Sequence, residues 1–151
     1  MSALKKGRRK IKIRRIILLV LSVAVLGTVI ALLADAPARR ELRYLAIGDV
    51  DFTRLRDGTY IGEYAGTKGS SRNATVEVTI SGGRITEITI LKGALDSDGN
   101  AVELTDGMTI DDLFQKVLET ESLQVDAISG ATLTSKAHLK ALENALKHAQ
   151  H

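Results

Sequence analysis

The chain has 151 residues, enough for one modest domain and an appended segment. It contains no cysteine, which excludes disulfides, thiolate metal sites, iron–sulfur clusters and an acylated cysteine anchor. Eight of its 21 basic residues lie between Lys5 and Arg15, and the remaining 13 face 18 acidic residues, so the rest of the chain carries a net charge of −5. The overall positive charge therefore does not indicate a nucleic-acid-binding domain, and no nucleic acid is expected among the partners.

The first two predicted parts are a basic arm at residues 1–15 and a transmembrane helix at residues 16–34. The run from Ile16 to Ala34 has 19 residues without a charge. At about 1.5 Å per residue, a helix of this length spans roughly 28 Å, close to the thickness of a bilayer's hydrocarbon core. Its apolar residues surround the whole helix, unlike the single stripe of a surface-bound amphipathic helix.

The distribution of positive charge sets the predicted orientation of this helix. The basic arm precedes it, whereas the charges of residues 35–43 nearly cancel. The positive-inside rule then predicts a single-pass protein of the cell membrane, with a cytoplasmic N-terminus, an extracytoplasmic domain and direct contact with membrane lipid. A cleaved signal peptide is the alternative, because Ala34-Asp35-Ala36 resembles a small-x-small cleavage site. The length of the apolar run and Pro37 just beyond the site favour an uncleaved anchor.

Residues 35–56 are predicted to form a juxtamembrane stalk, and residues 57–151 a folded domain. Within the stalk, Pro37 is expected to break the helix and residues 38–46 to form a short helix of their own. The domain should open with a strand at Asp57-Gly58-Thr59-Tyr60-x-Gly62.

An antiparallel hairpin is predicted next in the domain. Residues 74–80 and 85–91 alternate apolar and polar side chains on either side of a turn at Gly82-Gly83. Thr109-Ile110-Asp111-Asp112 resembles a capping box, which predicts a helix through Leu118. A short strand at 123–125 and a final helix with Thr132 as its N-cap should follow, which gives an α+β fold with an antiparallel sheet and packed helices.

Two other patterns are weaker. Asp96-Ser97-Asp98-Gly99-Asn100 has acidic residues in a loop, but its glycine falls too early for a calcium-binding EF-hand, so we expect a plain turn. The three histidines, His138, His148 and His151, show no spacing typical of metal ligands. No metal site is therefore predicted in this chain.

Small and hydroxyl-bearing residues crowd the stretch from Asp126 to Ser135, directly before the last predicted helix. The start of a helix leaves several backbone N–H groups unpaired and carries roughly half a positive charge, so it is a favourable seat for a phosphate. Gly130 and Ala131 keep the backbone uncrowded there. From the residues alone, an ordinary capped surface helix is the commoner interpretation of this pattern.

The pattern Asp126-x-x-Ser129-Gly130-Ala131-Thr132-x-Thr134 resembles the flavinylation motif of the covalent FMN-binding domain family. That family includes the FMN-carrying subunits of sodium-pumping NADH:quinone reductase and of Rnf-type complexes. The residues from Asp57 to Gly62 also resemble the start of its domain. The resemblance implies a phosphoester between FMN and the hydroxyl of Thr134. It places the other cofactor-binding residues in the same stretch: Asp126, Ser129, Gly130, Ala131, Thr132 and Ser135.

The resemblance also implies partners and a role. A separate flavin transferase, which uses FAD as donor and needs a divalent metal, would attach the cofactor. The chain would then be an extracytoplasmic electron carrier, with a membrane redox donor and acceptor that are quinone- or NADH-linked. No Ser/His/Asp arrangement or carboxylate pair stands out, so we expect an electron-transfer flavoprotein or a redox-complex subunit rather than a self-contained enzyme, with no catalytic residue of its own.

Two alternatives stay open at this point. Tyr60, Tyr64 and Phe114 are the aromatic residues that would stack on the flavin ring, but each is equally suited to the core. The alternative function for the chain is that of a non-redox, membrane-anchored binding or regulatory domain that keeps the fold without the flavin.

Overall fold

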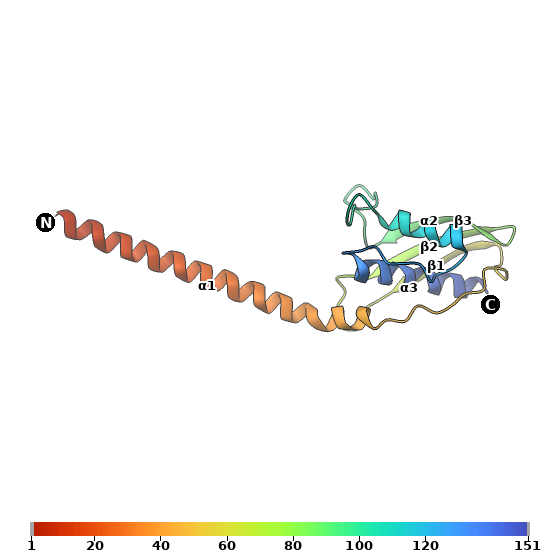
Figure 1. Cartoon of the computed structure of the whole chain (residues 1–151), viewed down its shortest axis with the longest axis horizontal. Helices are drawn as coiled ribbons and strands as arrows, with labels where there is room; N and C mark the ends of the chain where they lie inside the picture. The colour runs from red at the N-terminus through yellow and green to blue at the C-terminus, as the bar shows by residue number, and fades with distance from the viewer. Residues whose placement is uncertain (1, 151) are drawn as a thin grey trace. The chain divides into compact units, whose positions relative to one another are not determined.

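The computed structural model describes residues 2–150, with side chains from Arg15 onward. Its elements follow the order α1 (Ser2–Arg43), β1 (Gly58–Tyr64), β2 (Ala74–Ser81), β3 (Arg84–Lys92), α2 (Ile110–Thr120) and α3 (Thr132–Ala149) (Figure 1). The chain divides into two compact units, Met1–Pro37 and Ala38–His151. His151 and the side chains of nearly all of the predicted basic arm lie outside the described residues.

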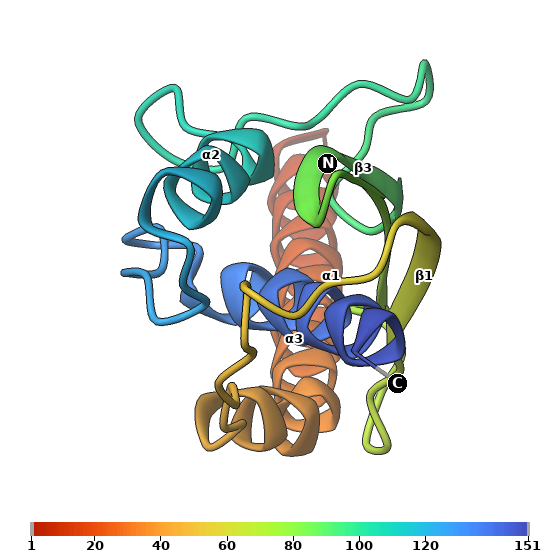
Figure 2. The same ribbon diagram turned by 90° about the vertical axis from the view of Figure 1, so that its right-hand side faces the viewer.

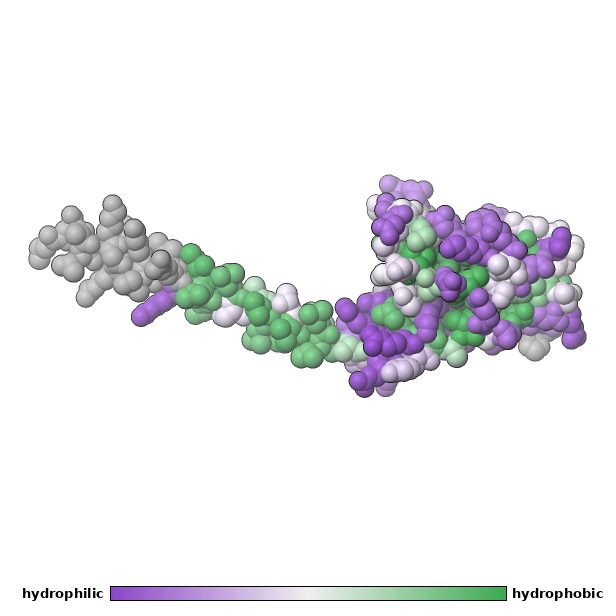
Figure 3. All heavy atoms as spheres, viewed as in Figure 1, coloured by the Kyte–Doolittle hydropathy of each residue, from purple (hydrophilic) through white to green (hydrophobic). Residues whose placement is uncertain are grey.

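Helix α1 is long and apolar enough to cross a membrane between Arg15 and Arg43. Its large apolar side chains from Ile16 to Leu33 are between 44% and 67% exposed, and they cover the visible face of this part of the helix (Figure 3). A signal sequence near an N-terminus has the same length and composition. The helix therefore fits either a membrane span or a signal sequence.

The predicted helix break at Pro37 is wrong, because Pro37 lies inside α1. A proline removes one backbone N–H from the hydrogen-bond ladder, but the residues around it keep their helical conformation here. The predicted separate helix at 38–46 is instead the end of α1, which stops at Arg43. Residues 45–51 have no regular secondary structure.

Most of the predicted stalk, residues 38–56, belongs to the second compact unit. Leu42 and Leu55 are only 2% and 7% exposed and lie in its hydrophobic core. The carboxylate of Glu41 accepts hydrogen bonds from the backbone N–H groups of Thr67 and Lys68, each at 3.0 Å. Apolar burial and specific hydrogen bonds thus attach this segment to the domain along its length.

The three strands form an antiparallel sheet in the order β1-β2-β3 (Figure 1). On the central strand, Val76, Val78 and Ile80 are at most 2% exposed, as the predicted alternation requires. The carboxylate of Asp57 accepts hydrogen bonds from the backbone N–H groups of Gly82 and Gly83 at 2.9 and 2.7 Å. The acidic residue before β1 therefore holds the turn between β2 and β3.

Helix α3 packs against β1 and β2 (Figure 2). A Cβ atom on Gly62 of β1 would lie 2.1 Å from the carbonyl oxygen of Ala141 and 2.2 Å from the backbone nitrogen of Ala145. Only a glycine facing two alanines allows the helix this close to the strand. This contact fixes where α3, and with it the motif at its start, lies on the sheet.

Helix α2 begins with the predicted capping box, since the backbone N–H and the hydroxyl of Thr109 donate to the Asp112 carboxylate at 2.7 and 3.0 Å. The predicted strand at 123–125 is wrong, because these residues have no strand partner. Leu123 is nevertheless only 3% exposed, so its apolar side chain anchors a loop rather than a strand. The sheet with its packed helices confirms the α+β fold.

Candidate functional site

The motif loop, residues 126–131, leads directly into the first turn of α3. The helix begins at Thr132 with Ala131 in the N-cap position, so the predicted N-cap at Thr132 is wrong by one residue. Gly130 has a φ of +78°, and a Cβ there would lie 3.0 Å from the Thr105 hydroxyl oxygen. The sharp bend at Gly130 sets the start of the helix, and Thr132 is left exposed on its first turn.

The buried side chain of Ser135 stabilises the conformation of this loop. Its side chain is fully buried, and its Oγ accepts the backbone N–H of Ile128 at 3.1 Å and donates to the carbonyl oxygen of Ala131 at 3.1 Å. Ile128 is itself 3% exposed and belongs to the core. Ser135 therefore shapes the loop through its backbone, and both of its hydrogen-bonding capacities are used inside the protein.

Thr134 lies at the edge of two neighbouring hollows. The first, of about 500 Å³, is lined by three arginines and by the start of α3: Arg39, Arg43, Arg72, Gly130, Ala131, Thr132, Leu133 and Thr134. We call it the basic hollow. The second, of about 220 Å³, is lined by residues 71–73, Gly93, Ala94, Leu95, Val102, Leu104, Thr134 and His138. We call it the apolar hollow, after its aliphatic side chains.

The two hollows differ in the chemistry they suit. Neither has an aspartate or glutamate among its lining residues in the described part of the chain. Guanidinium groups and the N-terminus of α3 both favour an anion in the basic hollow. The aliphatic walls of the apolar hollow favour a flat, uncharged group beside it. A ligand with a phosphate at one end and an aromatic ring at the other therefore matches the surroundings of Thr134.

His138, which the sequence did not single out, lies one turn after Thr134 and is 1% exposed. Its Nε2 accepts the backbone N–H of Ala94 at 3.3 Å, so Nδ1 carries the proton and donates to the carbonyl oxygen of Thr134 at 2.8 Å. Burial lowers the pKa of His138 below its ordinary value, against an opposing effect of the Thr134 carbonyl. A neutral imidazole thus joins the turn that carries Thr134 to the loop after β3.

The loop after β3 is shaped to receive this histidine. Gly93 has a φ of +127°, and a Cβ on it would lie 2.5 Å from His138 Nε2. The spacing of four residues between Thr134 and His138 places both on one face of α3, and this spacing is the signal in the sequence that could have pointed to the pair.

The remaining predicted site residues separate into two groups. Gly130, Ala131, Thr132 and Thr134 line the basic hollow, and Ser135 supports it. Asp126 and Ser129 are exposed on the loop and are not among the residues that line either hollow.

The aromatic candidates for ring stacking lie elsewhere. Phe114 and Tyr64 are 2% and 7% exposed and belong to the core, and Tyr60 donates from its hydroxyl to the carbonyl oxygen of Asp57 at 3.3 Å. None of the three is among the residues that line the hollows beside Thr134. Leu95 and Leu104 instead contribute aliphatic side chains to the lining of the apolar hollow.

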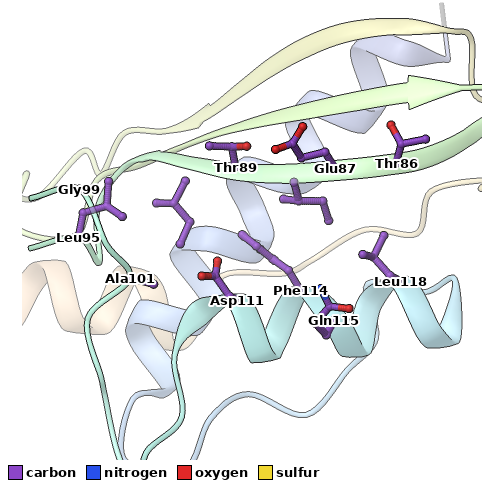
Figure 4. Close-up of a pocket in the computed structure, with 12 residues that line it drawn as sticks. Thr86, Glu87, Thr89, Leu95, Gly99, Ala101, Asp111, Phe114, Gln115 and Leu118 are labelled. Atoms are coloured by element: carbon purple, nitrogen blue, oxygen red, sulfur yellow. The ribbon is translucent and has the colours of Figure 1, made fainter.

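A third hollow, of about 420 Å³, lies between β3 and α2 and has the opposite charge. Its lining residues include Glu87 of β3 and Asp111 of α2, and Phe114 points from α2 toward β3 (Figure 4). Carboxylates with no basic residue among the lining residues repel a phosphate. This acidic hollow is therefore a poor phosphate site, and the basic hollow is the better candidate.

Comparison with known proteins identifies the family of the chain. Residues 69–147, more than half of the chain, match the family model of the FMN-binding domain. An uncharacterized protein of Treponema pallidum (strain Nichols) is 32% identical over 96 residues, which cover 64% of this chain and 24% of that protein. The chain thus spans about a quarter of that relative's length. The matched residues include β2, β3, α2 and the motif with most of α3, and the chain belongs to the FMN-binding domain family.

Proposed function

We propose that the chain is a membrane-anchored, extracytoplasmic electron carrier whose FMN is joined to Thr134 by a phosphoester bond. The observation that carries the proposal is the position of Thr134. Its side chain is partly buried at the border between the basic and the apolar hollow, in the first turn of α3. A phosphate bonded there would face arginines and a helix N-terminus, and the flavin ring would extend along aliphatic walls.

The other hydroxyls of the motif are less suitable attachment points. Ser135 is fully buried, with its Oγ committed to Ile128 and Ala131. Ser129 is exposed on the loop, outside both hollows. Thr132 lines the basic hollow but not the apolar one. Thr134 is the hydroxyl residue that borders both.

Attachment requires an activating partner, because a threonine hydroxyl is a weak nucleophile. His138 does not supply a base, since its Nε2 accepts from Ala94 and its Nδ1 proton points to a carbonyl oxygen. We assign activation to a flavin transferase with FAD and a divalent metal. The Thr134 Oγ forms a bond to the phosphorus on the FMN side of FAD, the bond from that phosphorus to the AMP oxygen breaks, AMP leaves, and the hydroxyl proton passes to the transferase.

Covalent attachment suits a protein on the outer side of a membrane. A cofactor held only by contacts dissociates in time and is diluted outside the cell, whereas an ester bond makes retention independent of affinity. Shallow hollows are then sufficient, because the protein has only to position the phosphate and leave one edge of the ring accessible to redox partners. The bound flavin would supply the electron-transfer chemistry.

The attachment site can be tested in a denaturing gel. The full chain is produced together with a flavin transferase, denatured, and examined for flavin fluorescence that survives denaturation. Wild type and Thr120→Val should fluoresce equally, and Thr134→Val should be dark. Thr120 is the control, because it is an exposed threonine of α2 that lies outside the motif and is not among the residues that line either hollow. A dark wild-type band, or a fluorescent Thr134→Val band, would contradict the proposal.

The carrier role needs a separate measurement. In isolated membranes that contain the flavinylated chain, the flavin absorbance should bleach when a physiological donor such as NADH is added and return when a quinone is added. Membranes with the Thr134→Val chain provide the baseline. If the bound flavin stays oxidised with every donor that reduces the membrane's other carriers, the chain is not an electron carrier.

A further inference from the structure

The family match begins at residue 69, yet two of the three arginines of the basic hollow, Arg39 and Arg43, come from the end of α1. They are four residues apart and therefore lie on the same face of the helix. Arg72 joins them from the loop before β2. The hollow beside Thr134 is thus built from two parts of the chain, one inside the matched domain and one outside it.

We propose that Arg39, Arg43 and Arg72 form the phosphate-binding part of the flavin site, so that the segment after the apolar helix completes the cofactor site. This inference rests on the proposed function. A phosphate esterified to Thr134 keeps one negative charge and two free oxygens. Guanidinium groups match such oxygens in geometry and stay charged at every physiological pH. The N-terminus of α3, which lines the same hollow, adds its backbone N–H groups.

The backbone that carries Arg43 is held in place by α3 itself. Lys136, two residues after Thr134, donates from Nζ to the carbonyl oxygens of Arg43 and Leu45 at 2.8 and 3.2 Å. One turn further along α3, Lys140 donates to the carbonyl oxygen of Ala46 at 3.2 Å. The helix that presents Thr134 therefore also fixes the end of α1.

The opposite side of the segment is anchored as well. Leu42, between the two arginines, is 2% exposed in the core. The Glu41 carboxylate is bound by Thr67 and Lys68 of the loop that leads to Arg72. These contacts fix the backbone from which Arg39 and Arg43 extend and tie it to the loop that leads to Arg72, so less backbone freedom is lost when a phosphate binds.

Arg40 provides a matched control for this proposal. It lies on the same helical turn as Arg39 and Arg43, has the same charge and is exposed as they are, but it is not among the residues that line the basic hollow. A comparison of Arg39→Gln/Arg43→Gln with Arg40→Gln separates a phosphate site from a general effect of positive charge on the transferase or the membrane surface.

The experiment measures how fast the full chain becomes flavinylated by a flavin transferase with FAD. The double variant should be modified about tenfold more slowly than wild type, because it loses charge-assisted contacts to the phosphate. Arg40→Gln should stay within about twofold of wild type. Equal rates for the double variant and wild type would overturn the inference. A wild-type chain that is never modified would instead contradict the proposed function.

A second measurement distinguishes phosphate binding from docking of the transferase. The modified fractions of wild type and of the double variant are isolated, and the ³¹P resonance of the phosphodiester is recorded. A resonance displaced in the double variant but not in Arg40→Gln supports contact between the arginines and the phosphate. An unchanged resonance together with a slower reaction shows that the arginines serve the transferase, and the inference is then wrong. Circular dichroism establishes that each variant is folded.

Discussion

At the scale of single residues, His138 decides how the turn with Thr134 is held. Its ring is buried and hydrogen-bonded on both nitrogens, to Ala94 and to Thr134. Protonation would add a charge in a buried place and remove the acceptor that Ala94 needs. The lowered pKa of His138 follows from that burial.

This burial predicts a loss of stability at mildly acidic pH. The pKa of His138 is lower in the folded chain than in the unfolded chain, where it is about 6.5. As the pH falls below about 6.5, the unfolded chain takes up the proton first, so the free energy of unfolding decreases until the folded pKa is passed. In His138→Gln the free energy of unfolding should depend less on pH in this range. Urea unfolding between about pH 7.5 and 5, a range that brackets the ordinary pKa of histidine, measures this dependence.

The control for this profile is His148→Gln, since His148 is exposed near the end of α3. That variant should keep the slope of the wild-type chain. If His138→Gln retains the full pH dependence, protonation of another group causes it, and the role given to His138 is wrong.

At the scale of elements, a cluster of hydrogen bonds and ion pairs around one carboxylate, Glu143, joins α3 to the segment after α1. Glu143 is fully buried, and its carboxylate accepts from Lys140 at 2.8 Å, from Lys147, and from the backbone N–H of Gly48 at 3.1 Å. Burial alone would raise the pKa of Glu143, but the bonds from the two lysines and Gly48 outweigh it and hold the pKa below its ordinary value. The charged carboxylate is therefore the stable form at neutral pH.

Removing this charge should loosen the contact between α3 and residues 43–48. Glu143→Gln leaves two lysines without their counter-charge, and we expect a loss of about 1–3 kcal/mol in the free energy of unfolding at pH 7. The difference should shrink in acid, because a group with a lowered folded pKa loses its contribution as the pH falls through that pKa. Glu119→Gln, on the exposed side of α2, should change the free energy by less than about 0.5 kcal/mol. Equal stability of the two variants would contradict the role of the cluster.

Among the elements, those with a local sequence pattern could be predicted and the contacts between distant elements could not. Local patterns gave the hairpin of β2 and β3 and the capping box at Thr109, because alternation and capping depend on residues a few positions apart. Long-range contacts remained hidden. Neither the bonds from Asp57 to the turn at Gly82 nor the contact of Gly62 with Ala141 leaves a local signature.

The site was predicted to a similar extent. The motif named Thr134 and its neighbours, since the resemblance is a continuous stretch of sequence. Arg39 and Arg43 lie more than 90 residues earlier, and only the packing of residues 38–43 within the second compact unit brings them to the basic hollow. For Phe114 the sequence left both the core and the flavin ring open, because an apolar residue in a helical pattern does not show which side of the domain it will face; the structure places it in the core.

At the scale of the whole molecule, the apolar helix and the domain suit different environments. The exposed apolar side chains of α1 suit lipid, whereas the domain carries the proposed flavin site and more acidic than basic residues. The basic arm before the helix predicts a cytoplasmic N-terminus and an extracytoplasmic domain. The placement of the flavin site outside the cytoplasm depends on this orientation.

The absence of cysteine makes the orientation easy to measure. We expect a single cysteine at the exposed position Thr53 (Thr53→Cys) to react with a membrane-impermeant maleimide in intact cells or in spheroplasts. Ser2→Cys, in the basic arm, should react only after lysis. Labelling of Ser2→Cys in unbroken cells, or protection of Thr53→Cys, would reverse the predicted topology. If the mature protein no longer contains residue 2, and so cannot be labelled there even after lysis, the helix is a cleaved signal sequence.

The most direct test of the central claim is the mass of the peptide that contains Thr134. The full chain is produced with a flavin transferase that is shown to modify another substrate in the same cells, and is then digested and analysed by mass spectrometry. The account predicts that this peptide gains the mass of FMN less one water, with fragment ions that place the addition on Thr134. A peptide of unmodified mass alone, or an FMN group on any other residue, would contradict it.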